Sequence, residues 1–238
     1  KKSVNNLMFR TMAGNDITIK GNFFFEQFKN VLDSYDDATY SMQVKPSSFR
    51  STYDDHSLGV NLTSSFKIQQ NGLTRLSLTF RKDVHKEEGN FNQGFKSYEA
   101  DNLSLAAEQD LQITGELSII AGGSINFLKP VFANGGELRA SSSIPNANLG
   151  INFNPDEKIS IHANIAGKSR FPTLKEFYSE TQGRYVSNPE LSPEKSVNSE
   201  VGVSYRYFDK NIIGVTFYYS SIGNLIKEMP LAGGLKQF

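Results

Sequence analysis

The sequence contains no cysteine and no tryptophan, and only three of its 238 residues are histidines. Without cysteine the chain can form no disulfide, no thiolate zinc site and no cysteine nucleophile. The histidines, His56, His85 and His162, lie at no spacing that suits a shared metal ion. The sequence therefore predicts neither a metal site nor a cofactor.

An excess of charge is also missing, because 25 basic residues balance 25 acidic residues. A nucleic-acid binder needs surplus cations for phosphate groups, so we expect no nucleic-acid partner. No glycine-rich phosphate loop, G-x-S-x-G or H-E-x-x-H motif occurs, and we expect no enzymatic activity. Two charged groups, Asp54-Asp55-His56 and Glu87-Glu88, fall at predicted strand–loop junctions, where we interpret them as solvated rim charges.

No apolar run approaches the roughly 18 residues of a membrane-spanning helix. The basic N-terminus also lacks the continuous apolar region of a signal peptide. By hydropathy alone the chain resembles a soluble protein. A transmembrane β-barrel gives the same result, because only alternate side chains of its strands face lipid.

What the sequence does contain is an alternation of apolar and polar residues with a period of two, which is typical of β-strands. Between positions 146 and 153 the odd residues are apolar and the even residues are Asn or Gly, and after a turn at 154–157 the alternation resumes. The pattern predicts about ten to twelve antiparallel strands and no long helix. The other alternating segments are 17–25, 58–68, 76–80, 103–113, 117–125, 197–207 and 213–219.

The connections between these strands also alternate in length. Short turns are predicted at 71–72, 114–116, 154–157 and 208–211, and long connections at 82–97, 129–145 and 170–195. Short turns on one rim and long loops on the other are typical of outer-membrane barrels. A soluble β-sandwich, solenoid or propeller remains an alternative, since those folds alternate as well.

The polar faces of the predicted strands are rich in Asn, Ser, Thr, Gly and Gln, which suits a water-filled interior. Arg75, Arg81 and Arg206 are predicted to lie on these faces. His162 is predicted there too, and we interpret it as a hydrogen-bonding residue.

One segment, FPTLKEFYSETQGRYVSNPELSPEKS from Phe171 to Ser196, interrupts the alternation. Its T-x-x-E sequence, Thr173 to Glu176, has the form of a helix capping box placed just after a proline. We expect a single helical turn through Glu180. The apolar side of that turn would consist of Phe171, Leu174, Phe177 and Tyr178.

This segment resembles the signature of TonB-dependent outer-membrane receptors. RFPTLKEFY, NPELSPEKS and NSEVGV are similar to the family's F-x-x-P-x-L-x-E-L-Y, N-P-x-L-x-P-E-x-S and E-x-G-V elements, although Phe177 replaces the usual small aliphatic residue. The resemblance runs in order over roughly residues 57–228. The motif positions are Phe171, Pro172, Leu174, Glu176, Tyr178, Asn188, Pro189, Leu191, Pro193, Glu194, Glu200 and Gly202.

The resemblance implies an all-β fold, an antiparallel transmembrane β-barrel. The family's barrel has 22 strands with a separate plug domain in its lumen. We therefore expect residues 1–238 to be a portion of one such barrel domain, a partial barrel of about ten to twelve strands. The plug domain and the C-terminal strands are expected to be absent from this chain.

The resemblance also implies a function. Such a receptor takes up a scarce, large solute across the Gram-negative outer membrane, with a ferric siderophore as the first expectation. Its partners would be the TonB complex, acting through the plug, and the lipid and lipopolysaccharide of that membrane. A plugless porin-like channel and a soluble β-protein for adhesion or glycan binding remain alternatives.

Ligand contacts are expected on the long-loop rim, at Arg170, Tyr178, Arg184 and Tyr185. Arginine pairs with anionic chelates, and tyrosine stacks or hydrogen-bonds. The three arginines of the polar faces are expected to contact the plug instead.

Overall fold

In the computed structural model the chain forms one ten-stranded antiparallel sheet, in which each strand pairs with its neighbours in sequence. The structure describes residues 1–14, 16–45, 47–68, 71–90, 93–180, 185–208 and 211–238. The strands are β1 (Lys2–Ala13), β2 (Ile17–Ser34), β3 (Phe49–Ile68), β4 (Gly72–Glu88), β5 (Lys96–Gln112), β6 (Leu117–Ala133), β7 (Ser142–Phe153), β8 (Ile159–Arg170), β9 (Glu194–Tyr207) and β10 (Asn211–Gly223).

Two small elements accompany the sheet. The helix α1 (Leu174–Tyr178) lies between β8 and β9, and a ribbon of β11 (Met229–Pro230) and β12 (Lys236–Gln237) encloses the 3-10 turn η2 (Ala232–Gly234). Among the described residues, no helix has the length and apolar character needed to cross a membrane.

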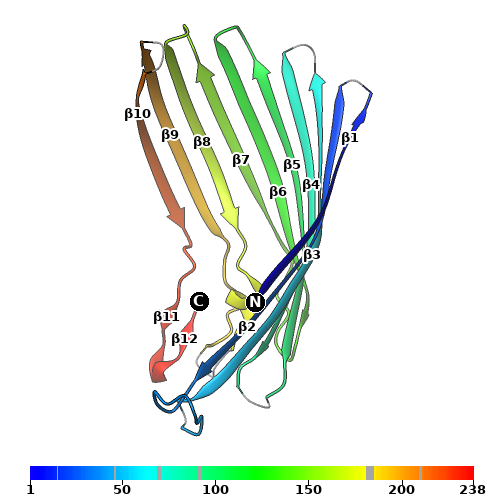
Figure 1. Ribbon diagram of the computed structural model, residues 1–238, viewed down its shortest axis with the longest axis vertical. Helices are drawn as coiled ribbons and strands as arrows, with labels where there is room; N and C mark the ends of the chain where they lie inside the picture. Colours follow the sequence, from blue (N-terminus) through cyan, green and yellow to red (C-terminus); the bar gives the residue numbers. More distant parts are fainter. Residues whose placement is uncertain (15, 46, 69–70, 91–92, 181–184, 209–210) are drawn as a thin grey trace.

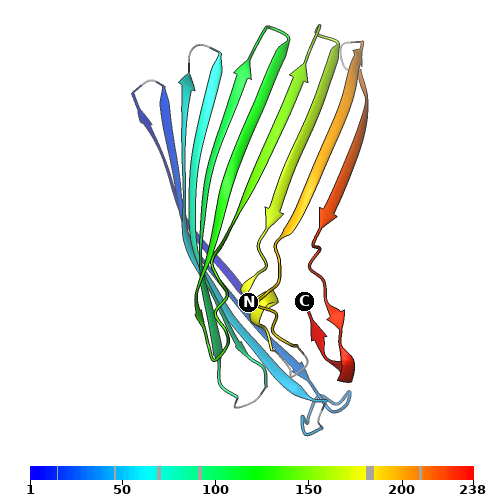
Figure 2. The ribbon, with the colours of Figure 1, turned by 180° about the vertical axis from the view of Figure 1, so that it is seen from behind.

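The sheet is curved like part of a cylinder wall, and β1 and β10 are its two edges (Figures 1 and 2). The tight turns lie together at one end, and α1 and the longer connections lie at the other, as the sequence predicts (Figure 1). The predicted all-β, partial antiparallel barrel is therefore confirmed.

Each face of the sheet has one chemical character. Cross-strand pairing places Ile151, Ala163, Val201 and Phe217 side by side in one row, one strand after another. The adjacent row of paired residues, which faces the other side of the sheet, is polar. That row consists of Asn152, His162, Gly202 and Thr216. The predicted alternation therefore continues unbroken from strand to strand.

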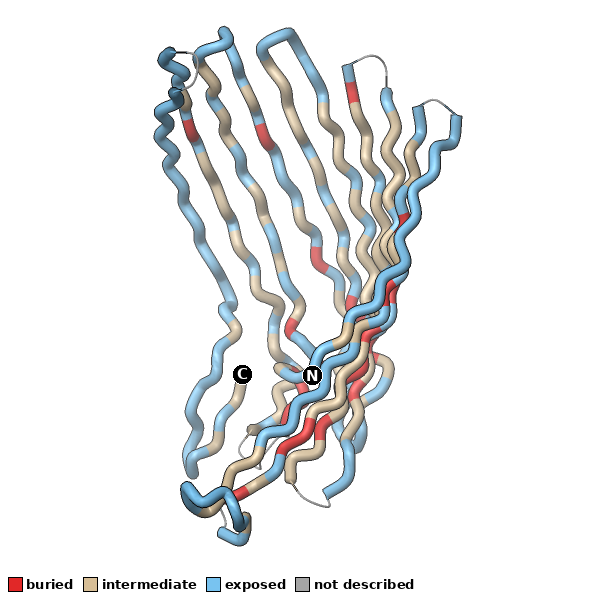
Figure 3. Tube along the Cα trace, viewed as in Figure 1, coloured by how far each residue is buried: buried red, intermediate tan, exposed pale blue. Residues whose placement is uncertain are grey.

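The apolar face ends before the strands do. Lys82 pairs with Asp101, and Asp101 pairs with Lys129, so a charged row crosses β4, β5 and β6 on that face. On β5 the apolar residues on the tight-turn side of this row run from Leu103 to Leu111. A tilted transmembrane strand needs about 9–11 residues, which fits this band. The strand ends nearer α1 therefore extend beyond this apolar band, and most buried residues gather at that end (Figure 3).

Two of the three predicted long connections are wrong. Strands β4 and β5 continue to Glu88 and from Lys96, and β6 and β7 continue to Ala133 and from Ser142. Polar residues dominate the extensions of β4 and β5, and prolines at 130 and 145 interrupt the apolar alternation in those of β6 and β7, so the pattern that marks the apolar band fades there. Pro130 is accommodated within β6 because the β5–β6 register shifts by one residue at that point.

Candidate functional site

The candidate site lies where the chain between β8 and β9 crosses the polar face of the sheet. The Thr173 hydroxyl accepts a hydrogen bond from the Glu176 amide at 3.2 Å, and the Glu176 carboxylate accepts one from the Thr173 amide at 2.6 Å. These reciprocal bonds form the predicted capping box and start α1. The helix ends at Tyr178, close to the predicted end of the turn.

The helix α1 is anchored by the main hydrophobic cluster of the described residues. Leu174, Phe177 and Tyr178 of α1 are buried against Tyr98 and neighbouring residues of β5 and β6. The ring of Tyr178 stacks parallel to that of Tyr98, with a centroid separation of 5.0 Å. The sequence correctly predicts the apolar side of α1. It does not predict the surface that α1 covers, because Tyr98 lies between the predicted connection 82–97 and the alternating segment 103–113 and carries no local signal.

A buried carboxylate holds the C-terminal end of α1. Glu87 of β4 is only 2% exposed, and its carboxylate accepts hydrogen bonds from the Ser179 hydroxyl at 2.8 Å and from the Glu180 amide at 2.9 Å. Our interpretation of Glu87 as a solvated rim charge is therefore wrong. The strand extends past the predicted loop boundary and turns this side chain toward the polar face, where α1 covers it.

His85 connects Glu87 to a second carboxylate. Its Nδ1 lies 2.6 Å from Asp55 Oδ1, and its Nε2 lies 3.3 Å from Glu87 Oε2. Burial lowers the pKa of His85, but the hydrogen bonds that its ring makes to Asp55 and Glu87 outweigh burial and raise the pKa to about 9. The two flanking carboxylates therefore favour the protonated imidazole at neutral pH. The interpretation of Asp55 as a solvated rim charge is also wrong, because its carboxylate bonds to the His85 ring.

Arg139, from the connection between β6 and β7, joins the two halves of the 171–193 segment. Its guanidinium lies over the Phe177 ring at 4.5 Å and donates hydrogen bonds to the Pro189 carbonyl at 2.9 Å and to the Leu191 carbonyl. Its backbone amide donates to the Tyr178 hydroxyl at 3.1 Å. Sequence reasoning missed this residue, because no local pattern marks a cation that acts 50 residues away.

Arg170, a predicted ligand contact, is held by two carboxylates. Its guanidinium donates to Glu194 at 2.8 Å and to both carboxylate oxygens of Glu176, at 2.8 and 3.1 Å. These bonds raise the pKa of Arg170. Burial raises the pKa of Glu176, but the bonds from Arg170 and Thr173 outweigh it, and the pKa lies below its usual value. This network ties the start of α1 to the start of β9.

The other predicted ligand contacts lie in different surroundings. Tyr178 is buried in the α1 cluster, and Arg184 lies outside the described residues. Tyr185 is partly exposed, stacks on Phe238, and donates its hydroxyl to Glu228 at 2.5 Å. Burial and Glu228 raise the pKa of Tyr185 to about 12. Ligand contact by these residues stays a prediction.

The remaining motif positions each have a structural contact. The Asn188 amide donates to the Phe177 carbonyl at 2.8 Å, and its side chain donates to the Phe238 carbonyl at 2.8 Å. The Pro193 carbonyl accepts from the Asn224 side chain at 3.4 Å. A Cβ at Gly202 would lie 2.3 Å from the His162 ring, so only glycine fits there.

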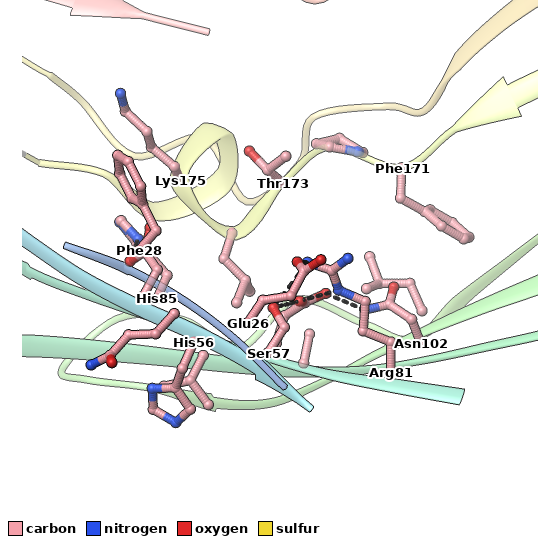
Figure 4. A pocket seen from close by; sticks show the side chains of 18 of the residues that line it. Glu26, Phe28, His56, Ser57, Arg81, His85, Asn102, Phe171, Thr173 and Lys175 are labelled. Carbon is pink, nitrogen blue, oxygen red and sulfur yellow. Dashed lines mark hydrogen bonds and ion pairs between the residues drawn. The ribbon is translucent and has the colours of Figure 1, made fainter. Parts of the chain in front are cut away.

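A cavity of about 520 Å³ lies between α1 and the polar face. Its roof is the start of the 171–193 segment, from Phe171 to Lys175, and its floor comes from β2 to β6 (Figure 4). Arg81 donates to Asp83 at 2.5 Å and to the Ser57 hydroxyl at 2.9 Å, and lies 3.5 Å from Glu26. The cavity is thus lined by charges that neutralise one another beside an apolar patch.

Further along the polar face, toward the tight turns, two further pairs of charged or titratable side chains are in contact. His162 Nε2 lies 2.9 Å from Glu200 Oε1, which confirms its interpretation as a hydrogen-bonding residue. Arg75 pairs with Glu108 at 2.6 Å. No group of metal-ligating side chains suited to an ion occurs among the described residues.

A curved antiparallel sheet with one continuous apolar face and one polar face defines the class of membrane-spanning β-barrels. The comparison with family models agrees and is more specific. The model described as "TonB dependent receptor-like, beta-barrel" matches residues 5–237. The chain belongs to the TonB-dependent receptor family, whose members are outer-membrane receptors and transporters of Gram-negative bacteria and not enzymes.

Solved structures share this fold. The copper transporter OprC has a TM-score of 0.79 at 15% identity, and the match covers 99% of this chain and 40% of that one. The iron transporter FrpB from Neisseria meningitidis has a TM-score of 0.73 at 14% identity, over 99% of this chain and 39% of that one. A variant of the ferric enterobactin receptor PfeA from Pseudomonas aeruginosa gives 0.71 at 17% identity, over 95% and 35%.

The chain spans about 40% of the length of these structures. At such identities the likeness shows the fold alone. No curated protein sequence matches the chain at a significant level.

Proposed function

We propose that this chain is a portion of an outer-membrane receptor that takes up a scarce, large solute by TonB-energised transport, with a ferric siderophore as the substrate class. The family match over residues 5–237 is the observation that carries this proposal. Similar structures include a copper transporter, an iron transporter and a ferric enterobactin receptor, which supports a metal or metal chelate as the solute.

The proposal includes a complete barrel. Strands β1 and β10 each have one edge without a neighbour in the described sheet. Unpaired backbone groups are costly in lipid, so we propose that further strands close the wall and that residues 1–238 are one part of a single barrel domain. A plug domain would contact the polar face, with Arg75, Arg81 and Arg206 as proposed contacts, and would link the barrel to the TonB complex.

The surrounding membrane is the second proposed partner. The apolar face is open along the sheet, with Ile165 50% and Val201 54% exposed. In water such a face would be an aggregation surface, whereas outer-membrane lipid and lipopolysaccharide would cover it. The exposed apolar face therefore favours an outer-membrane location over a soluble adhesion or glycan-binding protein.

Of the four proposed ligand contacts, Arg170 and Tyr185 are the first to test, because the Arg170 side chain is 43% exposed and Tyr185 is partly exposed. Tyr178 is buried and would reach a solute only after its present contacts opened. Arginine at these positions suits an anionic chelate.

A growth assay on defined iron sources tests the proposal. Deletion of the gene should abolish growth on one ferric siderophore while growth on ferrous salts continues, and the complete receptor should restore it. Growth unchanged on every iron source tested would refute the substrate class. Restoration by a receptor whose plug cannot engage TonB would refute energised uptake and favour a porin-like channel.

A further inference from the structure

Glu87 is the feature of this structure that the proposed function leaves unexplained. Its carboxylate is almost fully buried, yet it bonds to Ser179 and Glu180, which lie 92 and 93 residues further along the chain. Both bonds end on the residues that directly follow α1. A helix of five residues has no stability of its own, so contacts such as these decide where it lies.

The buried carboxylate is matched by a buried cation. Burying an unpaired charge is costly, and His85 supplies the opposite charge while Asp55 balances its second nitrogen. The rings of Tyr53 and Tyr98 flank the His85 ring, with centroids 5.5 and 6.1 Å away. The chain of charges is therefore enclosed by aromatic side chains.

The other charged and titratable groups around His85 are few. Lys175 of α1 lies over the Tyr53 ring at 5.0 Å, and Tyr178 stacks on Tyr98. Lys96 pairs with Glu180 on the exposed side. With the pKa of His85 raised to about 9, the pairing of Asp55, His85 and Glu87 is intact at neutral pH.

We propose that Glu87, joined to His85 and Asp55 in one hydrogen-bonded chain, is a positioning residue that fixes the C-terminal end of α1 and so holds the roof of the cavity over the polar face. Packing against the hydrophobic cluster favours contact but does not specify the position of the helix end. The two directed hydrogen bonds at Glu87 do specify it. The contacts of Glu87 are sufficient to argue that it anchors α1. Only the part of the cavity in uptake rests on the proposed function.

Pulsed EPR on the complete receptor tests this proposal, with any cysteine outside residues 1–238 replaced beforehand. The chain itself has no cysteine, so within it labels attach only where one is introduced. One label replaces exposed Lys175 on α1, and the other replaces Ser104 on the polar face of β5. The labelled receptor should give one narrow distance distribution. Glu87→Gln should add a second, broader population, with the undocked fraction raised roughly tenfold or more, as expected for loss of a buried charged hydrogen-bond partner.

The matched control is Glu88→Gln, which makes the same change at the next residue of β4. Glu88 accepts its hydrogen bond, at 3.1 Å, from the Gly94 amide in the connection between β4 and β5. This variant should keep the narrow distribution. Raising the pH of the otherwise unmutated receptor through about 9 should broaden the distribution toward that of Glu87→Gln, since His85 loses its proton.

A second variant keeps the test decisive if Glu87→Gln fails to fold. Ser179→Ala removes one of the two hydrogen bonds that Glu87 accepts, and it should broaden the distribution of distances between the labels only partially. Heat-modifiable gel mobility reports that each variant forms a barrel. An unchanged narrow distribution in the folded variants would overturn the proposal. Because the measurement uses no ligand, a failure of the uptake assay would leave this result unaffected.

Discussion

Replacing Phe177 by alanine should release α1 from the wall of the barrel. Phe177 is fully buried, and Phe→Ala substitutions in cores cost about 3–5 kcal/mol. Loss of the Arg139 guanidinium from the ring face removes about 0.5–2 kcal/mol of cation–π attraction within that total. Because the helix has only five residues, the whole loss acts on its docking. A change of about 3 kcal/mol shifts the docked-to-undocked ratio roughly hundredfold.

Hydrogen exchange measures this release directly. The Ser179 amide donates to the Lys175 carbonyl at 3.0 Å, and the Asn188 amide donates to the Phe177 carbonyl at 2.8 Å, so both amides should lose protection in Phe177→Ala. Phe208→Ala is the matched control, since Phe208 is 82% exposed at a tight turn. Unchanged protection at both amides in Phe177→Ala would refute the conclusion that this packing holds α1.

The remaining predictions concern charge, pH and lipid contact. Arg170→Gln should increase proteolysis of the 171–193 segment and cost about 1–3 kcal/mol of its docking; lost siderophore affinity with unchanged proteolysis would instead support direct ligand contact. The pKa of Glu176 is below its usual value in the folded chain, so its contribution is fully present above about pH 4.5 and is lost as the pH falls through the lower folded value. Hydrogen exchange at α1 between pH 3 and 7 should show this loss, and Arg170→Gln should flatten it. On β8, Ala163→Arg should destabilise the lipid-embedded barrel by about 2–4 kcal/mol in denaturant titrations, whereas Asn164→Arg on the polar face should cost much less; equal losses would contradict the assignment of the two faces.

The strand pattern is predictable from sequence because it arises locally. A residue such as Ile151 and its neighbour Asn152 must point to opposite faces of a strand, so one reading of the alternation fixes both faces. The capping box at Thr173 is local for the same reason, since its partner lies three residues away. These features depend on spacing along the chain, and the structure agrees with them.

The contacts that build the candidate site join residues that are far apart in the sequence. Glu87 and Glu88 look alike in the sequence, yet one is buried under α1 and the other bonds to its own loop. Arg139 has no sequence signal at all, because its partners lie on a segment that folds back across the sheet. No pattern of period two distinguishes a strand that ends at the membrane surface from one that continues beyond it.

The sequence by itself determined the alternating strands, the tight turns, the start of α1 and the family. Only the tertiary structure decided that β4 and β5 extend past the apolar band and that α1 returns onto their polar face. That return brings His85, Glu87 and Tyr98 together with residues more than 70 positions away. Burial then converts charges that would be solvated on an open rim into an ordered network, because a carboxylate removed from water must find its partners within the protein.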